Sequence, residues 1–463
     1  MNISDYPHTA ILIGSELSIY WIFPFIGILL SIAILPLIKP TFWHHNYGKI
    51  SILWSLSFLL PFAFWKGGGV AIFHLFDVLL LDYLPFIILL LSLYTISGGI
   101  RIKGRFSGTP KGNTMLILVG TILASWMGTT GASMLLIRPI LKANKSRHYN
   151  VHTIVFFIFL VANIGGALTP LGDPPLFLGF LHGVNFFWTT KIMFLPMFMV
   201  SMALLIIYYI IDSFYYRKEK TPDIKDDINK EPLGIEGYGN IILLLIVISA
   251  VLMSGFWKPQ IDEISILGVH VTVPNILRDI LLIALVFISW YITNTEIRNR
   301  NGFTWHPIKE VSKLFAGIFI TIIPVIAILH AGSNGKMHHI INMLGDIDGN
   351  PINSMYFWLT GILSGFLDNA PTYLVFFNIA GASSHEGTII AQYLMNEIPK
   401  TLMAISSGAV FMGALTYIGN APNFIIQSIA EENNVKMPSF FGYMKWSILI
   451  LIPTLFLLSF IIF

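Results

Sequence analysis

Cysteine is absent from the 463 residues, and only 11% of them are Asp, Glu, Lys or Arg. The first absence excludes disulfide bonds, thiolate metal sites and cysteine nucleophiles. The scarcity of charge excludes an ordinary soluble domain, in which about 25% of residues are charged. Apolar residues are abundant instead: 55% are hydrophobic and the mean hydropathy is +0.75. The composition therefore predicts an integral membrane protein whose partner is the lipid bilayer.

Apolar runs close to 20 residues long mark ten predicted membrane spans. They lie at about 19–38, 48–65, 79–100, 151–169, 189–212, 239–257, 276–294, 314–332, 399–418 and 440–463. Two more apolar stretches, 113–137 and 351–381, are interrupted by the polar segments 128–133 (GTTGAS) and 368–372 (DNAPT). We interpret these stretches as re-entrant helical hairpins with the polar segments at their tips. The alternative is that each is a plain span with a polar kink.

The distribution of Lys and Arg favours the hairpins. If both are re-entrant and the N-terminus lies outside, 21 of the 27 Lys and Arg residues fall on the cytoplasmic side. Cytoplasmic loops of membrane proteins are enriched in these residues. The first hairpin then opens to the cytoplasm and the second to the outside.

The stretch Asn163–Leu181 cannot form one continuous helix. Pro170 and the proline pair at 174–175 remove backbone donors and clash with the preceding turn, so the helix must break near Gly172. Broken backbone at membrane depth is tolerated only where it lines a cavity or is buried in protein. Asp173 lies at this break, where a carboxylate is costly and is a candidate functional group.

The same pattern recurs in the segment 414–430. Thr169, Gly172, Asp173 and Pro175 match Thr416, Gly419, Asn420 and Pro422 at one constant offset. At the hairpin tips, Thr129, Thr130 and Ser133 match Asp368, Asn369 and Thr372, again at a constant offset. Two corresponding interrupted helices in the two halves of a membrane chain are the best sequence indicator of a transporter's binding site.

These patterns predict an all-α polytopic membrane protein of two inverted repeats, each with about five spans, one hairpin and one broken helix. The first repeat covers 1–214, with its hairpin at 113–137 and its broken helix at 151–183. The second covers 239–463, with its hairpin at 351–381 and its broken helix at 399–431. The charged segment 215–238 between them is predicted to be a solvated cytoplasmic linker.

Polar side chains at the tips and breaks form the predicted ion- or substrate-binding set. It comprises Asp173 and Asp368, the amides Asn163, Asn369, Asn420 and Asn423, the hydroxyls Thr129, Thr130, Ser133, Thr169, Thr372 and Thr416, and the glycines Gly172 and Gly419. Oxygen-rich donors without thiolates or a dense histidine cluster suit a small hard cation. The predicted ligands of Na⁺ are Asp173, Asp368, Asn369 and Asn420.

The two carboxylates also suit a proton. Burial favours the protonated form of a carboxylate and a bound cation favours the ionised form, so cation and proton compete for one site. A simpler interpretation stands beside this one. Asn and Thr at helix breaks often cap exposed backbone groups, and Asp173 can cap the half-helix that follows it.

Other charged residues near span ends are expected to be interfacial. Asp82, Arg278 and Asp279 belong to this group, and Asp212 is expected to face water. His330 lies within a predicted span, where a hydrogen-bonded packing histidine is expected in preference to a proton relay.

Three segments resemble the NhaD-type sodium/proton antiporters of the ion transporter superfamily: TPLGDPPLF at 169–177, FLDNAPT at 366–372 and TYIGNAPNF at 416–424. That superfamily also contains citrate carriers, arsenite permeases and divalent-anion/sodium symporters. The resemblance covers nearly the whole chain. It implies a homodimer, a scaffold of the first two spans and their repeat equivalents, and an elevator-type movement of the domain that carries the hairpins. Many NhaD-type members carry an acidic–amide pair at the first tip, whereas residues 128–131 here read GTTG.

The leading functional hypothesis is a secondary active transporter that exchanges Na⁺, or Li⁺, for H⁺. The alternative is a sodium-coupled citrate or dicarboxylate symporter or an oxyanion permease, which two carboxylates in one site disfavour. No enzyme is expected, since an H-E-x-x-H or Asp–Asp protease motif is missing, and a channel fits inverted broken helices less well than alternating access does. We expect a multi-pass protein of the bacterial inner (plasma) membrane, with no cofactor besides the transported Na⁺ and H⁺ and no nucleic-acid partner.

Overall fold

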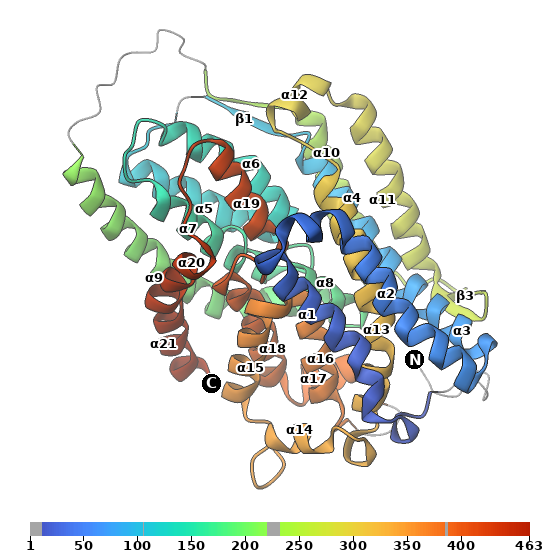
Figure 1. The fold of residues 1–463 in the computed structure, drawn as a ribbon. Coiled ribbons are helices and arrows are strands. Elements are labelled where there is room, and N and C mark those ends of the chain that lie inside the picture. Colours follow the sequence, from blue (N-terminus) through green and yellow to red (C-terminus); the bar gives the residue numbers. More distant parts are fainter. Residues whose placement is uncertain (1–11, 105, 220–231, 385–387) are drawn as a thin grey trace.

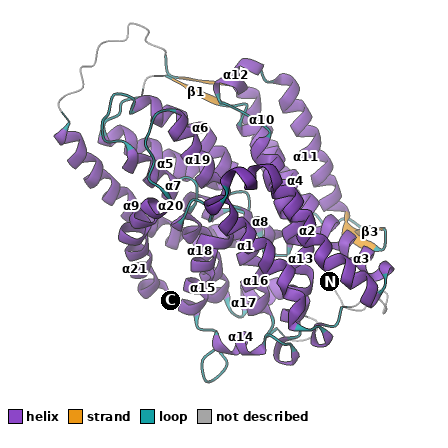
Figure 2. Cartoon of the chain, viewed as in Figure 1, coloured by secondary structure: helices purple, strands orange, loops and turns teal. Residues whose placement is uncertain are grey.

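The computed structural model describes residues 12–104, 106–219, 232–384 and 388–463, and these are almost entirely helical (Figure 2). Nine helical segments in these ranges are long and apolar enough to cross a membrane, and a tenth is a bent pair, 390–396 with 399–415. The ten segments correspond one for one to the ten predicted spans. The protein is therefore an all-α polytopic membrane protein, as its composition predicts.

The first half contains the predicted spans, hairpin and break in the expected order. Its helices are α1 (Phe23–Ile38), α2 (Pro40–Lys66), α3 (Gly68–Val78), α4 (Leu84–Ser97), α5 (Pro110–Met127), α6 (Thr129–Ala143), α7 (Val151–Leu160), α8 (Pro174–Leu181) and α9 (Phe186–Lys218). Short 3₁₀ segments are η2 (Gly14–Glu16), η3 (Ile19–Ile22) and η5 (Ile164–Leu168). A π-helical turn, η4 (Leu79–Tyr83), joins α3 to α4.

The second half repeats this order. Its helices are α10 (Tyr238–Phe256), α11 (Val273–Ile292), α12 (Thr295–Arg300), α13 (His306–His330), α14 (His338–Met343), α15 (Asn353–Leu367), α16 (Asn369–Gly381), α17 (Ile390–Asn396), α18 (Pro399–Met412), α19 (Ala421–Glu432), α20 (Phe440–Trp446) and α21 (Ile452–Ile462). The 3₁₀ segments are η6 (Gly332–Asn334) and η7 (Gly413–Leu415), and a second π-helical turn is η8 (Ser447–Leu451).

Two short antiparallel strand pairs lie in the connections. Strand β1 (Arg101–Lys103) pairs with β2 (Gly234–Glu236), and β3 (Glu263–Ile266) pairs with β4 (Val269–Thr272). A hydrogen bond from Arg101 holds the pKa of Glu236 below its usual range, and Lys103 adds to this effect. The predicted linker 215–238 thus begins with the last turn of α9, which ends at Lys218, and contains strand β2 near its end; its middle, 220–231, lies outside the described residues.

The two hairpins turn at equivalent backbone positions. Helices α5 and α6 meet at Gly128 (φ 79°, ψ 148°), and α15 and α16 meet at Asp368 (φ 78°, ψ 141°). The structural match therefore pairs Gly128 with Asp368 and Thr129 with Asn369, one residue away from the predicted match of Thr129 with Asp368. The sequence match was made on polar residue types, whereas the feature that the two tips share is a backbone residue with a positive φ. Glycine adopts such a conformation without strain, whereas Asp368 is strained there, because its ψ lies well outside the left-handed helical region that Asp tolerates.

The two helix breaks also share their backbone geometry. Thr169 (φ −138°, ψ 159°) corresponds to Thr416 (φ −137°, ψ 169°). Asp173 (φ −143°, ψ 144°) corresponds to Asn420 (φ −152°, ψ 136°). These angles agree with the match made from the sequence, whereas the inverted membrane orientation of the two halves stays a prediction.

Figure 1 shows β1 and α12 at one end of the molecule and α14 at the opposite end. The predicted topology requires this separation, since it assigns β1 and α12 to the cytoplasm and α14 to the outside. Its direct test uses single cysteines in this cysteine-free chain, at the exposed residues Ser146 and Ser383. We expect a membrane-impermeant maleimide to label Ser146→Cys only from the cytoplasm and Ser383→Cys only from outside. Labelling of both from one side would make the hairpins ordinary spans.

Candidate functional site

A cavity lies where the two hairpin tips and the two helix breaks meet. Its wall includes residues 128–131, 170–174, 420–422 and Asp368. The rest of the wall is mainly apolar and comes largely from α4 and α13. The centres of water molecules can occupy about 60 Å³ of this cavity. That is room for about four water molecules or a partly hydrated small cation.

Four helices begin at this cavity, namely α6, α8, α16 and α19. The residues at their N-cap positions are Gly128, Asp173, Asp368 and Asn420, and all four line the cavity. A helix N-terminus carries roughly half a positive charge, so the four N-termini offset part of the negative charge of two ionised carboxylates. This arrangement explains how two Asp residues are accommodated at membrane depth.

Asp173 is the centre of the hydrogen-bond network and is 2% exposed. Its Oδ1 accepts hydrogen bonds from Thr129 Oγ1 at 3.1 Å and from Asn420 Nδ2 at 3.0 Å. Its Oδ2 accepts one from Asn369 Nδ2 at 2.5 Å. The side chain makes no capping bond to α8, so the capping interpretation of Asp173 is wrong. Donors from both halves of the chain converge on this one carboxylate instead.

Asp368 and Asn369 form the second tip. Asp368 caps α16, because its Oδ1 accepts a hydrogen bond from the backbone of Ala370 at 3.2 Å, while its carboxylate lines the cavity. Asn369 uses Nδ2 for Asp173 and leaves its Oδ1 buried, without a partner in the part of the chain that the structure describes. An unpartnered buried oxygen is costly. Asn369 itself does not line the cavity wall, so the structure places Asp368 at the cavity and Asn369 behind it, on Asp173.

The amides Asn163 and Asn423 contact the site through Asn420. Asn420 Nδ2 lies 3.2 Å from Asn163 Oδ1, and Asn163 Nδ2 donates to Asn423 Oδ1 at 2.7 Å. Asn423 in turn donates to the backbone oxygens of Gly413 at 2.8 Å and Thr416 at 2.9 Å. This chain of amides connects the two breaks and orients Asn420. Asn163 and Asn423 do not line the cavity wall, and their predicted part in binding stays a prediction.

The predicted hydroxyls and glycines divide into several groups. Thr129, Thr130 and Gly172 line the cavity, and Thr129 also donates its backbone N–H to Gly172 O at 2.8 Å. Thr169 and Thr416 bind backbone oxygens of their own hairpins, those of Ser125 and Gly365. Thr372 donates its hydroxyl hydrogen bond to Asp368 O at 2.8 Å. Ser133 is buried and does not line the cavity. Gly419 packs so closely against backbone that the Cβ of any other residue would lie 2.6 Å from Gly413 O.

Ser125 is a positioning residue that sequence reasoning missed. Its Oγ donates to Gly165 O at 2.5 Å and accepts from the backbone of Leu168 at 3.1 Å. Its backbone oxygen accepts from Thr169. One serine thus joins α5 to the break, but a lone serine in an apolar helix gives no sequence signal for this role.

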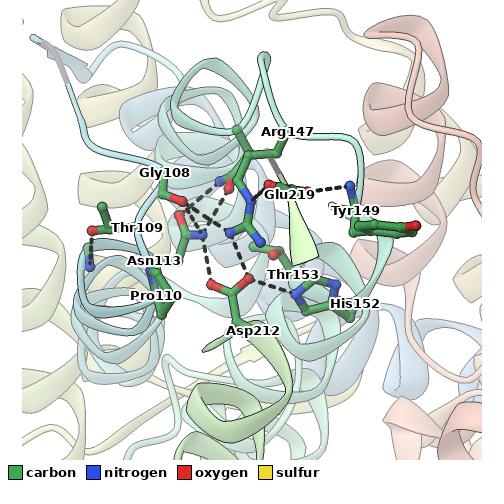
Figure 3. A network of polar contacts seen from close by, with 12 residues as sticks. Gly108, Thr109, Pro110, Asn113, Arg147, Tyr149, His152, Thr153, Asp212 and Glu219 are labelled. Carbon is green, nitrogen blue, oxygen red and sulfur yellow. Dashed lines mark hydrogen bonds and ion pairs between the residues drawn. The ribbon is translucent and has the colours of Figure 1, made fainter. Parts of the chain in front are cut away.

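A second polar network lies at the base of the first hairpin (Figure 3). Asp212, which we expected to face water, is fully buried. Its Oδ1 lies 2.7 Å from Arg147 Nη1 and 2.8 Å from His152 Nε2. Its Oδ2 accepts a hydrogen bond from Asn113 Nδ2 at 3.1 Å, and Arg147 Nε also pairs with Glu219 at 3.0 Å. The network connects the hairpin to the end of α9. The prediction failed because Arg147, His152 and Asn113 all lie more than 50 residues from Asp212 in the sequence; Tyr208, four residues away, also donates to its Oδ2 at 3.1 Å.

Replacement of Arg147 by Met is expected to lower the free energy of unfolding by about 3–5 kcal/mol, because it leaves the buried Asp212 without its positive partner. Unfolding in detergent micelles measures this loss. The exposed Lys145→Met serves as the matched control, and the double variant Arg147→Met/Asp212→Asn is expected to regain part of the stability. Equal stability of the Arg147 and Lys145 variants would contradict the assigned role of the ion pair.

The structure bears on two further expectations for charged residues. Arg278 is fully buried within the protein, with its Nε 2.8 Å from Asp279 Oδ1, while its interfacial position in the membrane stays a prediction. His330 Nε2 lies 2.7 Å from Asn378 Oδ1, which fits the expected hydrogen-bonded packing histidine.

Comparison with known proteins adds one finding. Residues 14–463 match the model of a protein family described as "Putative citrate transport". Comparison with curated proteins gives no significant match. The matched range includes all ten spans, both hairpins and both breaks, so the agreement extends over the whole described architecture. The chain therefore belongs to the family described as "Putative citrate transport" and is a multi-pass membrane transporter.

Proposed function

We propose that the protein is a secondary active transporter that binds Na⁺ and H⁺ in turn in the cavity between its hairpin tips and exchanges one for the other. One observation carries this proposal. The described cavity wall holds two carboxylates, Asp173 and Asp368, and no lysine, arginine or histidine. The side chain of Asn369, whose Nδ2 bonds to Asp173, keeps a buried Oδ1 that has no partner among the described residues. Such a set of oxygens attracts a small cation and repels an anion.

The same residues supply a mechanism. Na⁺ takes the Asp368 carboxylate as a ligand, with the Asp173 carboxylate as its nearest further charge. When Na⁺ leaves, a proton binds to a carboxylate in its place. The cavity therefore moves through the low-dielectric membrane with either Na⁺ or a proton bound, and its negative charge is compensated in both cases. Competition for one site is sufficient for exchange. The elevator-type movement and the homodimer implied by the NhaD-type resemblance belong to this proposal.

The second candidate is sodium-coupled citrate symport, and two observations favour it. The family description names citrate, and the four helix N-termini at the cavity are suited to an anion. In this case Na⁺ neutralises Asp173 and Asp368 before the carboxylates of citrate enter.

Na⁺ binding measured by calorimetry, with and without citrate, separates the two candidates. Exchange predicts that Na⁺ affinity depends on pH and is the same in both solutions. Symport predicts a higher Na⁺ affinity in citrate, because coupling between two ligands is reciprocal. An affinity that is raised by citrate and is indifferent to pH would overturn the proposal in favour of symport.

A further inference from the structure

A second group of ionisable side chains lies at the opposite end of α8 from Asp173. His182, which directly follows α8, has its Nε2 3.1 Å from Asp82 Oδ1 of the π-helical turn η4. Asp77 on α3 interacts electrostatically with both of them. None of the three lines the cavity described above. Since α8 has eight residues, or about 12 Å of helix, one short helix connects this group to the cavity.

The π-helical turn explains why Asp77 and Asp82 act together. They are five residues apart, and at 3.6 residues per turn such positions lie about 140° apart around an α-helix. In η4 the backbone N–H of Leu84 bonds to Leu79 O, five residues back. The wider turn rotates Asp82 towards the side of Asp77. Single π turns inside α-helices occur frequently at functional sites, and the sequence spacing alone conceals the pair.

Two polar atoms of this group have unfilled hydrogen-bonding capacity. Asp77 Oδ1 and His182 Nε2 are buried and have no hydrogen-bond partner among the described residues. His182 and Asp82 are within ion-pair distance, but their orientation does not make a hydrogen bond. A proton on Asp77 would create a donor, and a proton on His182 would give both carboxylates a positive partner.

The permanent positive charges on the surrounding elements have partners of their own. Arg278 of α11 lies 5.8 Å from the Phe177 ring on α8 and pairs with Asp279, and Lys66 at the end of α2, which packs against α3, pairs with Glu16. The sequences of α3, α4, α8 and α16 contain no lysine or arginine. The lysines of α13, Lys309 and Lys313, lie at its far end from His330. Other titratable side chains nearby include His74 on α3, Tyr83 on η4, His330 on α13, Tyr373 on α16 and, on β4, His270, which pairs with Glu263. The charges that act on Asp77 are those of Asp82 and His182, so protonation or a bound cation would neutralise this pair of carboxylates.

We propose that Asp77, Asp82 and His182 form a second proton-binding site. When His182 is protonated, it holds the end of α8 against the π turn; when it is neutral, this attraction is lost. Because α8 begins directly after Asp173, the proton occupancy of the site is coupled to the position of that carboxylate. Proton binding at these three residues does not depend on the proposed exchange function, whereas its part in transport rests on the proton coupling proposed above.

Histidine resonances of the full-length, ¹⁵N-histidine-labelled protein in lipid nanodiscs test the site directly. The signal that disappears in His182→Gln identifies His182. We expect it to titrate between pH 5 and 9, with a midpoint about one pH unit lower in Asp82→Asn, because an opposite charge within a few ångströms favours the charged imidazole by this amount or more. Asp77→Asn is expected to lower the midpoint in the same direction. Glu263→Gln, which removes the partner of His270 instead, serves as the matched control and is expected to leave the titration midpoint of His182 unchanged.

A midpoint that is equal in Asp82→Asn and in the unaltered protein, or no titration in this range, overturns the inference. Proteoliposome assays then separate it from the proposed function. His182→Gln is expected to shift the pH of half-maximal exchange by about one unit, and His330→Gln is expected not to. If His182 titrates as predicted but no cation drives proton movement, the exchange function fails and the site stands. If exchange occurs and His182 does not titrate, the inference alone fails.

Discussion

Proteoliposomes that contain Asp173→Asn are expected to lose cation-driven proton movement at least about 100-fold, which corresponds to roughly 2.7 kcal/mol of cation binding. The asparagine keeps the volume of the side chain but removes the negative charge on which Thr129, Asn369 and Asn420 converge. It also removes the group that a proton occupies when the cation leaves. Dye-reported pH changes inside the vesicles measure the loss.

A matched control distinguishes this effect from a general effect of replacing Asp by Asn. Asp346 lies in an exposed loop between α14 and α15, and Asp346→Asn is expected to retain full exchange. Unchanged melting behaviour of Asp173→Asn in detergent would show that the fold is intact. Full exchange in this variant would remove Asp173 from the ion site.

The second large effect concerns pH. In the range where protons occupy the cavity, lowering the pH by one unit is expected to weaken Na⁺ binding about tenfold, or about 1.4 kcal/mol, if one proton competes with one cation. The sign follows from the competition: more protons leave fewer ionised carboxylates for Na⁺. Above this range the affinity is expected to become independent of pH. A Na⁺ affinity that is constant from pH 5 to pH 9 would contradict competition at Asp173 and Asp368.

Much of the architecture follows from the sequence because membranes impose strict rules on it. Apolar length predicts each of the ten spans, since a bilayer sets how many residues must cross it. The break at Asp173 is predictable from the prolines around it, and its counterpart at Asn420 from the recurring pattern. The convergence of Asp173, Asn369 and Asn420 follows once the breaks and tips are assumed to meet.

Other features depend on geometry that residue types do not encode. The match between the hairpin tips is displaced by one residue, because Gly128 and Asp368 share a positive φ but are different residue types. Asp212 was misplaced because Arg147 reaches it from a distant loop. Asp77 and Asp82 were not recognised as a pair because the π-helical turn changes the rotation of the helix between them.

The family match and the cavity emphasise different ligands. The family description names citrate, while the two carboxylates of the described cavity wall favour a cation. Both statements hold if members of one family share the hairpins and helix breaks and differ in the side chains at the tips. In that case the tip residues Asp368 and Asn369 decide which ligand is carried.

The central claim is that this cavity exchanges a cation for a proton. The most direct measurement uses the purified protein in liposomes with an internal pH dye, challenged in turn with Na⁺, Li⁺, K⁺ and citrate in the absence of any other gradient. The account predicts that outside Na⁺ or Li⁺ alone raises the internal pH, as protons leave in exchange, and that citrate without Na⁺ produces no change. Internal pH that is unmoved by Na⁺ alone, together with uptake of labelled citrate that requires Na⁺, would contradict it.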